Sequence, residues 1–509
     1  MLPLRRFIPG RVLNLGAAIT VWCCVTATAA AGPRLAELPE RPRELSRAAL
    51  AQGDTNWDVR AGLLWAGRNE TGSRMHGVRP TAWYALGLLL RGEPGDRDRA
   101  VQALEAVLRQ QVDAPGMPWH GTFFRRAEEP RPLNGARMWD DYDPNWRQFI
   151  GCTFAQVLID YADELPEALR GRLLRSIALA LEGELAHGRL KPAYTNIALM
   201  QGFLLGFAGE RLQRPEWIRA AQDWVGEIER EFVAHESFDE YNSPTYYGVD
   251  LYGLALLRAH GATPELRVVG AHLEAALWRD IGRFYHAGLR NLAGPYDRAY
   301  GMDLQEYVAL AGTWMGFVLP AEATPLPAVM PARHGGDFYF TPCFALLGAV
   351  VPAEVQAQLE TFTGERLLAR PIADGKRVAT AWLGPDLMIG AQDTALSRGV
   401  PQARSQFHPA TIHWRRPDGG TAWLALRECS RVNARAEPHR LHIEAIGDAT
   451  FRIETAGLTA AMISAGHWQL PGLVVRIEHD AGDCKIDLDA AGATVTYREA
   501  TRFTLHCEP

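Results

Sequence analysis

The hydrophobic positions of the chain follow one period in its first part and another in its last part. Between about residues 35 and 319, apolar side chains recur mostly with the three- and four-residue spacing of helices that bury one face. Short polar segments separate these stretches, so successive helices should pair as antiparallel hairpins, which can stack in a line or close into a ring. The spacing predicts helices at 81–91, 97–111, 144–162, 166–185, 196–207, 215–233, 244–260, 264–284 and 304–317.

After a segment rich in proline and glycine at 323–336, apolar and polar residues alternate with a period of two. Turns with Gly, Asp and Pro separate the alternating stretches, as is typical of antiparallel strands. We therefore expect an α+β multidomain chain, in which a helical domain at 32–325 precedes an antiparallel β-sandwich at 326–509. The less regular stretch at 338–390 is expected to mix helix and strand.

The first 31 residues have the layout of a signal peptide. Arginines precede an apolar run at 12–25, and the small residues TATAAAG follow it. The apolar run is shorter than the roughly 20 residues that a membrane-spanning helix needs. We expect a periplasmic or secreted protein with no membrane contact after cleavage.

Composition narrows the function classes. The chain has 509 residues, 47% of them hydrophobic and 22% charged, which is ordinary for a soluble globular protein. With a net charge of -6 and scattered arginines, nothing indicates a nucleic-acid partner, although the arginines could form a local cationic cleft. Of the cysteines beyond the signal peptide, Cys429, Cys484 and Cys507 are the expected disulfide partners. No cysteine or histidine spacing indicates a metal site, and no cofactor is expected.

The segment 235–253, HESFDEYNSPTYYGVDLYG, gathers tyrosines and carboxylates around a predicted helix start. Ser243 is suited to cap the helix and Pro244 to be its first residue. Tyr246 and Tyr247 would then lie in the first turn, where the helix dipole favours negative charge and brings a phenol closer to ionisation. We interpret Tyr246 as a proton carrier; the alternative is that these tyrosines are packing residues with satisfied hydroxyls.

The order of several residues resembles a known family. Asn196 in KPAYTNIALMQGF precedes the Ser-Phe-Asp-Glu-Tyr segment at 237–241, Tyr246 lies five residues after Tyr241, and Arg298 follows in GPYDRAYGMD. This pattern resembles the polysaccharide lyases of the chondroitin-AC, hyaluronate, alginate and heparinase type. Those enzymes combine an (α/α) toroid, which is an incomplete helical barrel, with an antiparallel β-sandwich. Where the motif has a histidine, this chain has Tyr241.

The resemblance implies cleavage of an anionic polysaccharide or oligosaccharide by metal-independent β-elimination at a uronic acid. Asn196 would neutralise the C5 carboxylate. Tyr246 would take the C5 proton and then protonate the leaving oxygen. Arg298 would hold the carboxylate or keep Tyr246 ionised, and Tyr241 would be a second base or a sugar contact. In the alternative interpretation, Asn196 caps a helix and Arg298 forms an exposed ion pair.

Aromatic and polar loops supply candidate substrate contacts. Tryptophan can stack on sugar rings, although helical cores also bury it. The candidate substrate-binding residues are Trp119, His120, Trp146, His235, Glu240, Tyr247 and Tyr300.

Two other functions remain open. A glycoside hydrolase of the (α/α)-barrel type, either inverting or specific for unsaturated uronyl sugars, would need two carboxylic acids that face one bond. In the inverting case they would lie about 6.5–9.5 Å apart. The chain offers Asp140, Asp141, Asp143, Glu236, Asp239 and Glu240. A non-catalytic glycan-binding protein would also explain the aromatic loops. We find no GxSxG, P-loop, GxGxxG or HExxH motif.

Overall fold

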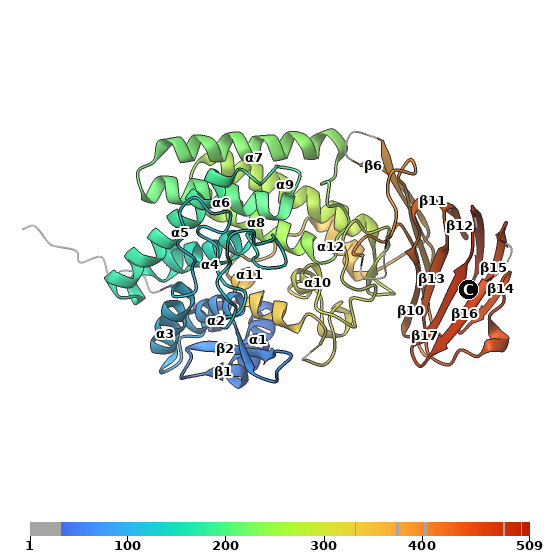
Figure 1. The fold of residues 1–509 in the computed structure, drawn as a ribbon, viewed down its shortest axis with the longest axis horizontal. Helices are drawn as coiled ribbons and strands as arrows, with labels where there is room; N and C mark the ends of the chain where they lie inside the picture. The colour runs from blue at the N-terminus through green and yellow to red at the C-terminus, as the bar shows by residue number, and fades with distance from the viewer. Residues whose placement is uncertain (1–31, 331, 373–375, 402–404, 482–483, 500) are drawn as a thin grey trace, which may run out of the picture. The chain divides into compact units, whose positions relative to one another are not determined.

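A computed structural model describes residues 32–330, 332–372, 376–401, 405–481, 484–499 and 501–509. The chain divides into two units, Met1–Ala31 and Gly32–Pro509, and all described residues belong to the second (Figure 1). The expected signal peptide lies outside the described residues. No helix in the described part of the chain is long and apolar enough to cross a lipid bilayer.

The N-terminal part of the described chain is mainly helical (Figure 1). Its helices are α1 (Glu40–Asn56), α2 (Val78–Arg91), α3 (Asp96–Leu108), α4 (Trp146–Asp160), α5 (Glu167–His187), α6 (Thr195–Arg211), α7 (Pro215–His235), α8 (Tyr246–His260), α9 (Pro264–Phe284), α10 (Leu310–Met315), α11 (Thr341–Leu347) and α12 (Ala353–Glu360). A small sheet of β1 (Trp57–Asp58), β2 (Leu63–Arg68) and β3 (Arg74–Gly77) interrupts them, as do the paired strands β4 (Tyr285–His286) and β5 (Asn291–Leu292).

The helices form an inner and an outer set. Helices α2, α4, α6 and α8 are buried on nearly all sides, as expected for helices that are apolar all round. Each packs against the helix that follows it, and α2, α4, α6 and α8 contact one another in succession. The outer helices bury only a stripe, which in α7 consists of Trp217, Ala221, Val225, Ile228 and Phe232. The predicted antiparallel hairpins are therefore confirmed.

The C-terminal part consists of two antiparallel sheets. Eight strands follow in the order β16-β17-β13-β10-β9-β8-β7-β6, and five in the order β11-β12-β18-β15-β14. Their inward side chains share one hydrophobic core, so the two sheets pack face to face. The strands are β6 (Arg366–Ile372), β7 (Arg377–Leu383), β8 (Leu387–Asp393), β9 (Ala410–Arg415), β10 (Thr421–Glu428), β11 (Arg431–Glu437), β12 (Arg440–Ile446), β13 (Ala449–Glu454), β14 (His467–Leu470), β15 (Leu473–His479), β16 (Cys484–Asp489), β17 (Gly492–Tyr497) and β18 (Arg502–Glu508).

This arrangement confirms the expected fold class, with helices in the N-terminal part and antiparallel sheets in the C-terminal part. The sequence pattern did not predict α1 or the small sheet of β1 to β3. Helices α11 and α12 follow residue 325, and the first strand of the two large sheets begins at Arg366. The division of the chain at residue 325 stays a prediction.

The predicted start of α8 was wrong by two residues, because the helix begins at Tyr246 after Thr245. Ser243 still contributes to the first turn, since its hydroxyl accepts a hydrogen bond from the Tyr246 N–H at 3.2 Å. The predicted helix at 304–317 shortens to α10.

The eight-stranded sheet contacts the segments of the helical part that carry candidate site residues. Ion pairs and a hydrogen bond join it and its loops to the helical part, namely Arg370–Asp280, Arg377–Asp239, Arg398–Asp297 and Tyr241–Gln392. Several of these side chains are buried, where breaking one partner of an ion pair is costly. The segment before α8 and the loop after β5 are therefore fixed from the sheet side.

The expected disulfide among the C-terminal cysteines is wrong. Cys429 and Cys507 are both buried free thiols, which leaves no pair among the three. Cys152 and Cys343 are also buried free thiols, in the helical part.

Packing at Gly248 gives a first test. A side chain at this position of α8 would overlap the backbone of Leu310 and Ala311, where the Ala311 N–H also donates to the Pro244 carbonyl at 3.0 Å. We expect Gly248→Ala to lower the free energy of unfolding by about 1–3 kcal/mol in denaturant titrations.

Gly226 on the outer helix α7 is the matched control. A Cβ there would meet only the Arg230 Nη1 atom, at 3.5 Å. Gly226→Ala should instead raise stability by up to about 1 kcal/mol. Equal effects of the two substitutions would contradict the close packing of α8.

Candidate active site

The guanidinium of Arg298 joins several of the predicted site residues. Its Nη1 pairs with the Glu240 carboxylate, and its Nη2 donates to the Tyr246 hydroxyl at 2.7 Å. The Arg298 Nε donates to the Gln406 side chain at 3.1 Å. The backbone carbonyl oxygen of Arg298 accepts a hydrogen bond from the Ser243 hydroxyl at 2.5 Å. The alternative interpretation of Arg298 as a member of an exposed ion pair is therefore wrong.

Asn196 lies on the other side of Glu240. Its Nδ2 donates to the second carboxylate oxygen of Glu240. Its side chain is fully buried, and its Oδ1 has no hydrogen-bond partner among the described residues. The helix-cap alternative is wrong, because α6 begins at Thr195 without a side-chain cap and Asn196 turns towards Glu240.

Two tyrosines form a pair beside the guanidinium. The hydroxyls of Tyr246 and Tyr300 lie 2.5 Å apart, and either could donate. The Arg298 Cζ atom lies 3.9 Å from the centre of the Tyr246 ring. The Tyr300 ring stacks on His334, with centroids 4.4 Å apart. The Tyr246 hydroxyl thus has a cation and a second phenol within hydrogen-bond distance.

Tyr246 is a neutral phenol in this state. Burial raises its pKa well above the ordinary value of 10.0, and Tyr300 adds to the shift while Arg298 opposes it. The expectation that the helix start brings this phenol closer to ionisation was wrong, because the loss of water around the hydroxyl outweighs the helix dipole. The positive charge of Arg298 favours a phenolate here.

The Glu240 carboxyl has a pKa close to neutral pH. Burial raises its pKa to about 7, while Arg298 and Asn196 oppose the shift. The side chain is 8% exposed. A carboxyl with this pKa can hold or release a proton at neutral pH, which is useful for acid–base chemistry.

The first turns of the inner helices gather near this cluster. Tyr246 begins α8, Asn196 lies in the first turn of α6, and Asn145 precedes α4. The Asn145 Nδ2 donates to the Tyr194 hydroxyl at 2.8 Å, and the Arg298 Cζ lies 6.0 Å from the Tyr194 ring centre. Helix N-termini carry unpaired N–H groups and a partial positive charge, so this end of the inner helices favours an anion.

Tyr194 and His334 were not among the residues predicted for the site. Tyr194 lies two residues before Asn196 in KPAYTNIALMQGF, and this proximity is the signal in the sequence that could have indicated it. His334 lies in the segment interpreted as a linker, so no motif marked it. Its place became visible only through its ring contact with Tyr300.

Tyr241 and Tyr247 lie outside the Arg298 cluster. Tyr241 is fully buried between Ile372 and Ala379, and its hydroxyl donates to Gln392 of β8. Tyr247 is also buried and donates to Asp280 at 2.6 Å. Both hydroxyls are already satisfied in the interior.

Trp119 and His120 are also held by structural contacts. Trp119 is buried edge-on against Tyr142, with centroids 5.6 Å apart. The His120 Nδ1 accepts from the Ala114 N–H at 3.0 Å. Trp146 is buried as well, but it lies at the start of α4 and lines a cavity next to the cluster.

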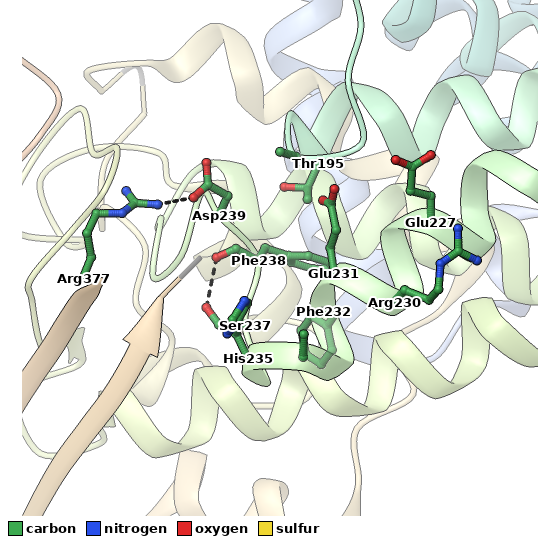
Figure 2. Close-up of a pocket in the computed structure, with 12 residues that line it drawn as sticks. Thr195, Glu227, Arg230, Glu231, Phe232, His235, Ser237, Phe238, Asp239 and Arg377 are labelled. Atoms are coloured by element: carbon green, nitrogen blue, oxygen red, sulfur yellow. Dashed lines mark hydrogen bonds and ion pairs between the residues drawn. The ribbon is translucent and has the colours of Figure 1, made fainter. Parts of the chain in front are cut away.

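His235 lines another cavity, of about 720 Å³, at the C-terminal end of α7 (Figure 2). Asp239 pairs with Arg377 at this cavity, and Glu227 and Glu231 face it from α7. Neither Tyr246 nor Arg298 lines it. The described residues contain no group of three or more His, Cys, Asp or Glu side chains that could hold a metal ion.

Comparison with known proteins gives two family matches. Residues 43–349 match the family described as "Domain of unknown function (DUF8769)", and residues 360–494 match "Domain of unknown function (DUF8770)". A search of curated proteins finds no match.

Solved structures show a remote likeness. The fold is similar to heparinase III at 10% identity and a TM-score of 0.44, over 93% of this chain and 85% of the other. It is also similar to a mutant of the Streptomyces coelicolor A3 chondroitin AC lyase at 10% identity and a TM-score of 0.40, over 92% and 79% of the two chains. The remote resemblance expected from the sequence is thus found again among solved structures.

The pKa of Glu240 makes stability depend on pH. Folding raises this pKa from 4.5 to about 7, so the contribution of Glu240 is fully present below about pH 4.5 and is lost as the pH rises through 7. Glu240→Gln cannot ionise. Between about pH 5 and pH 8, the free energy of unfolding of the natural protein should fall by about 1–3 kcal/mol relative to Glu240→Gln.

Denaturant titrations at the two pH values measure this difference. Glu70→Gln is the control, because Glu70 is exposed and its substitution should leave the difference near zero. A Glu240→Gln profile parallel to that of the natural protein would contradict the raised pKa.

Proposed function

The chain belongs to the family described as "Domain of unknown function (DUF8769)", and we propose that it is a polysaccharide lyase that cleaves an anionic polysaccharide by β-elimination at a uronic acid. The observation that carries this proposal is the single guanidinium of Arg298, which holds both the Glu240 carboxyl and the Tyr246 hydroxyl. With a signal peptide expected at 1–31, the proposed place of action is the periplasm or the medium.

The reaction has simple requirements. The C5–H bond of the uronic acid breaks, the C4–O4 bond breaks, and a C4=C5 double bond forms. The C5 proton passes to a base, and the leaving O4 receives a proton. Negative charge grows on the C5 carboxylate in between, so a nearby cation or hydrogen-bond donor lowers the barrier.

Arg298 is suited to neutralise the substrate carboxylate. Its side chain is 25% exposed, and a guanidinium can bind a carboxylate through two parallel N–H bonds. The partial positive charge at the N-termini of α6 and α8 acts in the same direction. An acidic sugar therefore suits this site better than a neutral one.

Glu240 adjusts the charge around that cation. With substrate bound, Arg298 would face the substrate carboxylate, Glu240 and a Tyr246 phenolate. One guanidinium does not balance three anions, and a second anion near Glu240 raises its pKa further above 7. In this proposal Glu240 takes up a proton when substrate binds, which leaves Arg298 for the substrate and Tyr246.

Tyr246 is the proposed base and acid. As a phenolate it would be stabilised by the positive charge of Arg298, whose Nη2 lies within hydrogen-bond distance of the hydroxyl. It takes the C5 proton, and the resulting phenol then protonates O4. The predicted direct contact between Asn196 and the substrate stays a prediction. Because the Asn196 amide is buried against Glu240, we assign it the role of positioning that carboxyl.

The proposed reaction is tested by its product. The purified protein would be incubated with uronate-containing polysaccharides, and the ultraviolet absorbance of the C4=C5 double bond would be followed with the release of reducing ends. A lyase produces both signals. Reducing ends without absorbance would identify a hydrolase, and binding without either signal would identify a glycan-binding protein; each of these results would overturn the proposal.

Removal of one hydroxyl tests the assignment of Tyr246. Tyr246→Phe should lower kcat by about 10²–10⁴-fold, because no other described group occupies its position as base and acid. Binding of the polysaccharide and the thermal unfolding midpoint should stay close to those of the natural protein.

Tyr241→Phe is the matched control from the same segment. It should keep kcat and lose about 1–2 kcal/mol of stability, because Gln392 loses its buried partner. Full activity in Tyr246→Phe, or loss of activity in a folded Tyr241→Phe, would contradict the assignment.

A further inference from the structure

A cavity of about 410 Å³ next to the Arg298 cluster is lined by arginines. The lining residues that matter here are Arg79, Arg125, Arg126, Trp146, His334 and Asp337. Arginines are suited to bind oxyanions through paired N–H groups.

The three arginines differ in their partners. Arg79 pairs with Asp337 at 3.2 Å, and Arg125 pairs with Glu129 at 2.8 Å. Arg126 has no ion pair among the described residues. It is half-buried, and burial lowers its pKa. The positive charges of Arg79 and Arg125 act in the same direction, while Glu129, which also lines the cavity, and Glu128 oppose the shift. A partly desolvated guanidinium that has two other arginines nearby and no ion pair of its own among the described residues is a site that an anion would stabilise.

Arg79 also contributes an N–H donor without a partner. Its Nε is buried and has no hydrogen-bond partner among the described residues. Its guanidinium lies over the rings of Trp83 and Trp146, at 4.8 and 5.0 Å from their centres. The wall beside Arg126 therefore offers a cation and an aromatic ring of the kind that contacts sugars.

Side-chain contacts link the cavity to the proposed catalytic cluster. His334 lines the cavity, stacks on Tyr300 at 4.4 Å, and Tyr300 contacts the Tyr246 hydroxyl. On the other side, Trp146 follows Asn145, whose amide donates to Tyr194 beside Arg298. The cavity is therefore separated from Tyr246 by the side chains of His334 and Tyr300.

We propose that this cavity is a subsite for a second acidic group of the same polymer, with Arg126 as its principal ligand. The inference rests on the proposed function in that the first acidic group lies at Arg298. The ligand is an oxyanion on a neighbouring sugar, either a carboxylate or a sulfate ester. The preferred substrate therefore carries charge on adjacent residues and not on isolated ones.

Binding to the Tyr246→Phe protein tests the subsite without consuming the probe. Calorimetry would use a hexamer of uronic acid, which carries a carboxylate on every sugar, and an alternating hexamer of uronic acid and N-acetylhexosamine. The third probe is the same alternating hexamer with sulfated hexosamines. The added Arg126→Gln substitution should raise Kd about tenfold or more for a probe with adjacent charges, and less than about twofold for the unsulfated alternating probe.

Arg131→Gln is the control. Arg131 is exposed a few residues further along the same loop, does not line this cavity, and its substitution should leave every Kd unchanged. Arg126→Lys, which keeps the charge but not the paired N–H groups, should give an intermediate Kd. Thermal unfolding checks that each variant is folded.

The outcomes separate the two proposals. If Arg126→Gln weakens binding of the fully carboxylated probe alone, the subsite is assigned to carboxylates. If it weakens binding of the sulfated probe alone, the subsite is assigned to sulfate esters. Equal Kd values for Arg126→Gln and Arg131→Gln on all probes, or binding of no probe, would overturn the subsite. If Arg126→Gln weakens binding but the natural protein forms no unsaturated product, the subsite stands and the lyase function fails.

Discussion

The rest of the site depends on the guanidinium of Arg298, a mostly buried positive charge that must be paired. Glu240 and Tyr246 reach it from the segment 235–253, and Gln406 reaches it from the connection between β8 and β9. The Ser243 hydroxyl donates to the backbone carbonyl of Arg298. Removing any one partner would leave a buried charge or donor unsatisfied, which is costly. The same constraint produces the chemistry, because one cation shared between a carboxyl and a phenol makes their protonation states interdependent.

The fold brings these segments together through the direction of its helices. Alternation of inner and outer helices makes the inner helices run the same way, so α4, α6 and α8 begin at the same end. Their first turns supply the site and give it a partial positive charge. The eight-stranded sheet fixes the connecting segments, since Tyr241 and Asp297 are tied to Gln392 and Arg398.

The sequence predicted the fold class well, because helical and strand periods are local properties of the chain. It also placed Asn196, Tyr246, Glu240, Arg298 and Tyr300 in the candidate site, and the structure brings these five together. Local pattern could not separate Tyr246 from Tyr241 and Tyr247, which differ in burial and partners. It also could not show that burial would raise the Tyr246 pKa, or that Arg79, Arg126 and His334 would line one cavity, since these depend on contacts between distant segments.

The central claim is that Arg298 and Tyr246 act on one acidic sugar. A crystal structure of the Tyr246→Phe protein with a bound uronic acid oligosaccharide tests it most directly. The account predicts that one carboxylate contacts the Arg298 guanidinium while the C5 atom of the same sugar faces the ring at position 246. An oligosaccharide bound elsewhere, for instance in the cavity beside α7, or one whose C5 atom faces away from that ring, would contradict it.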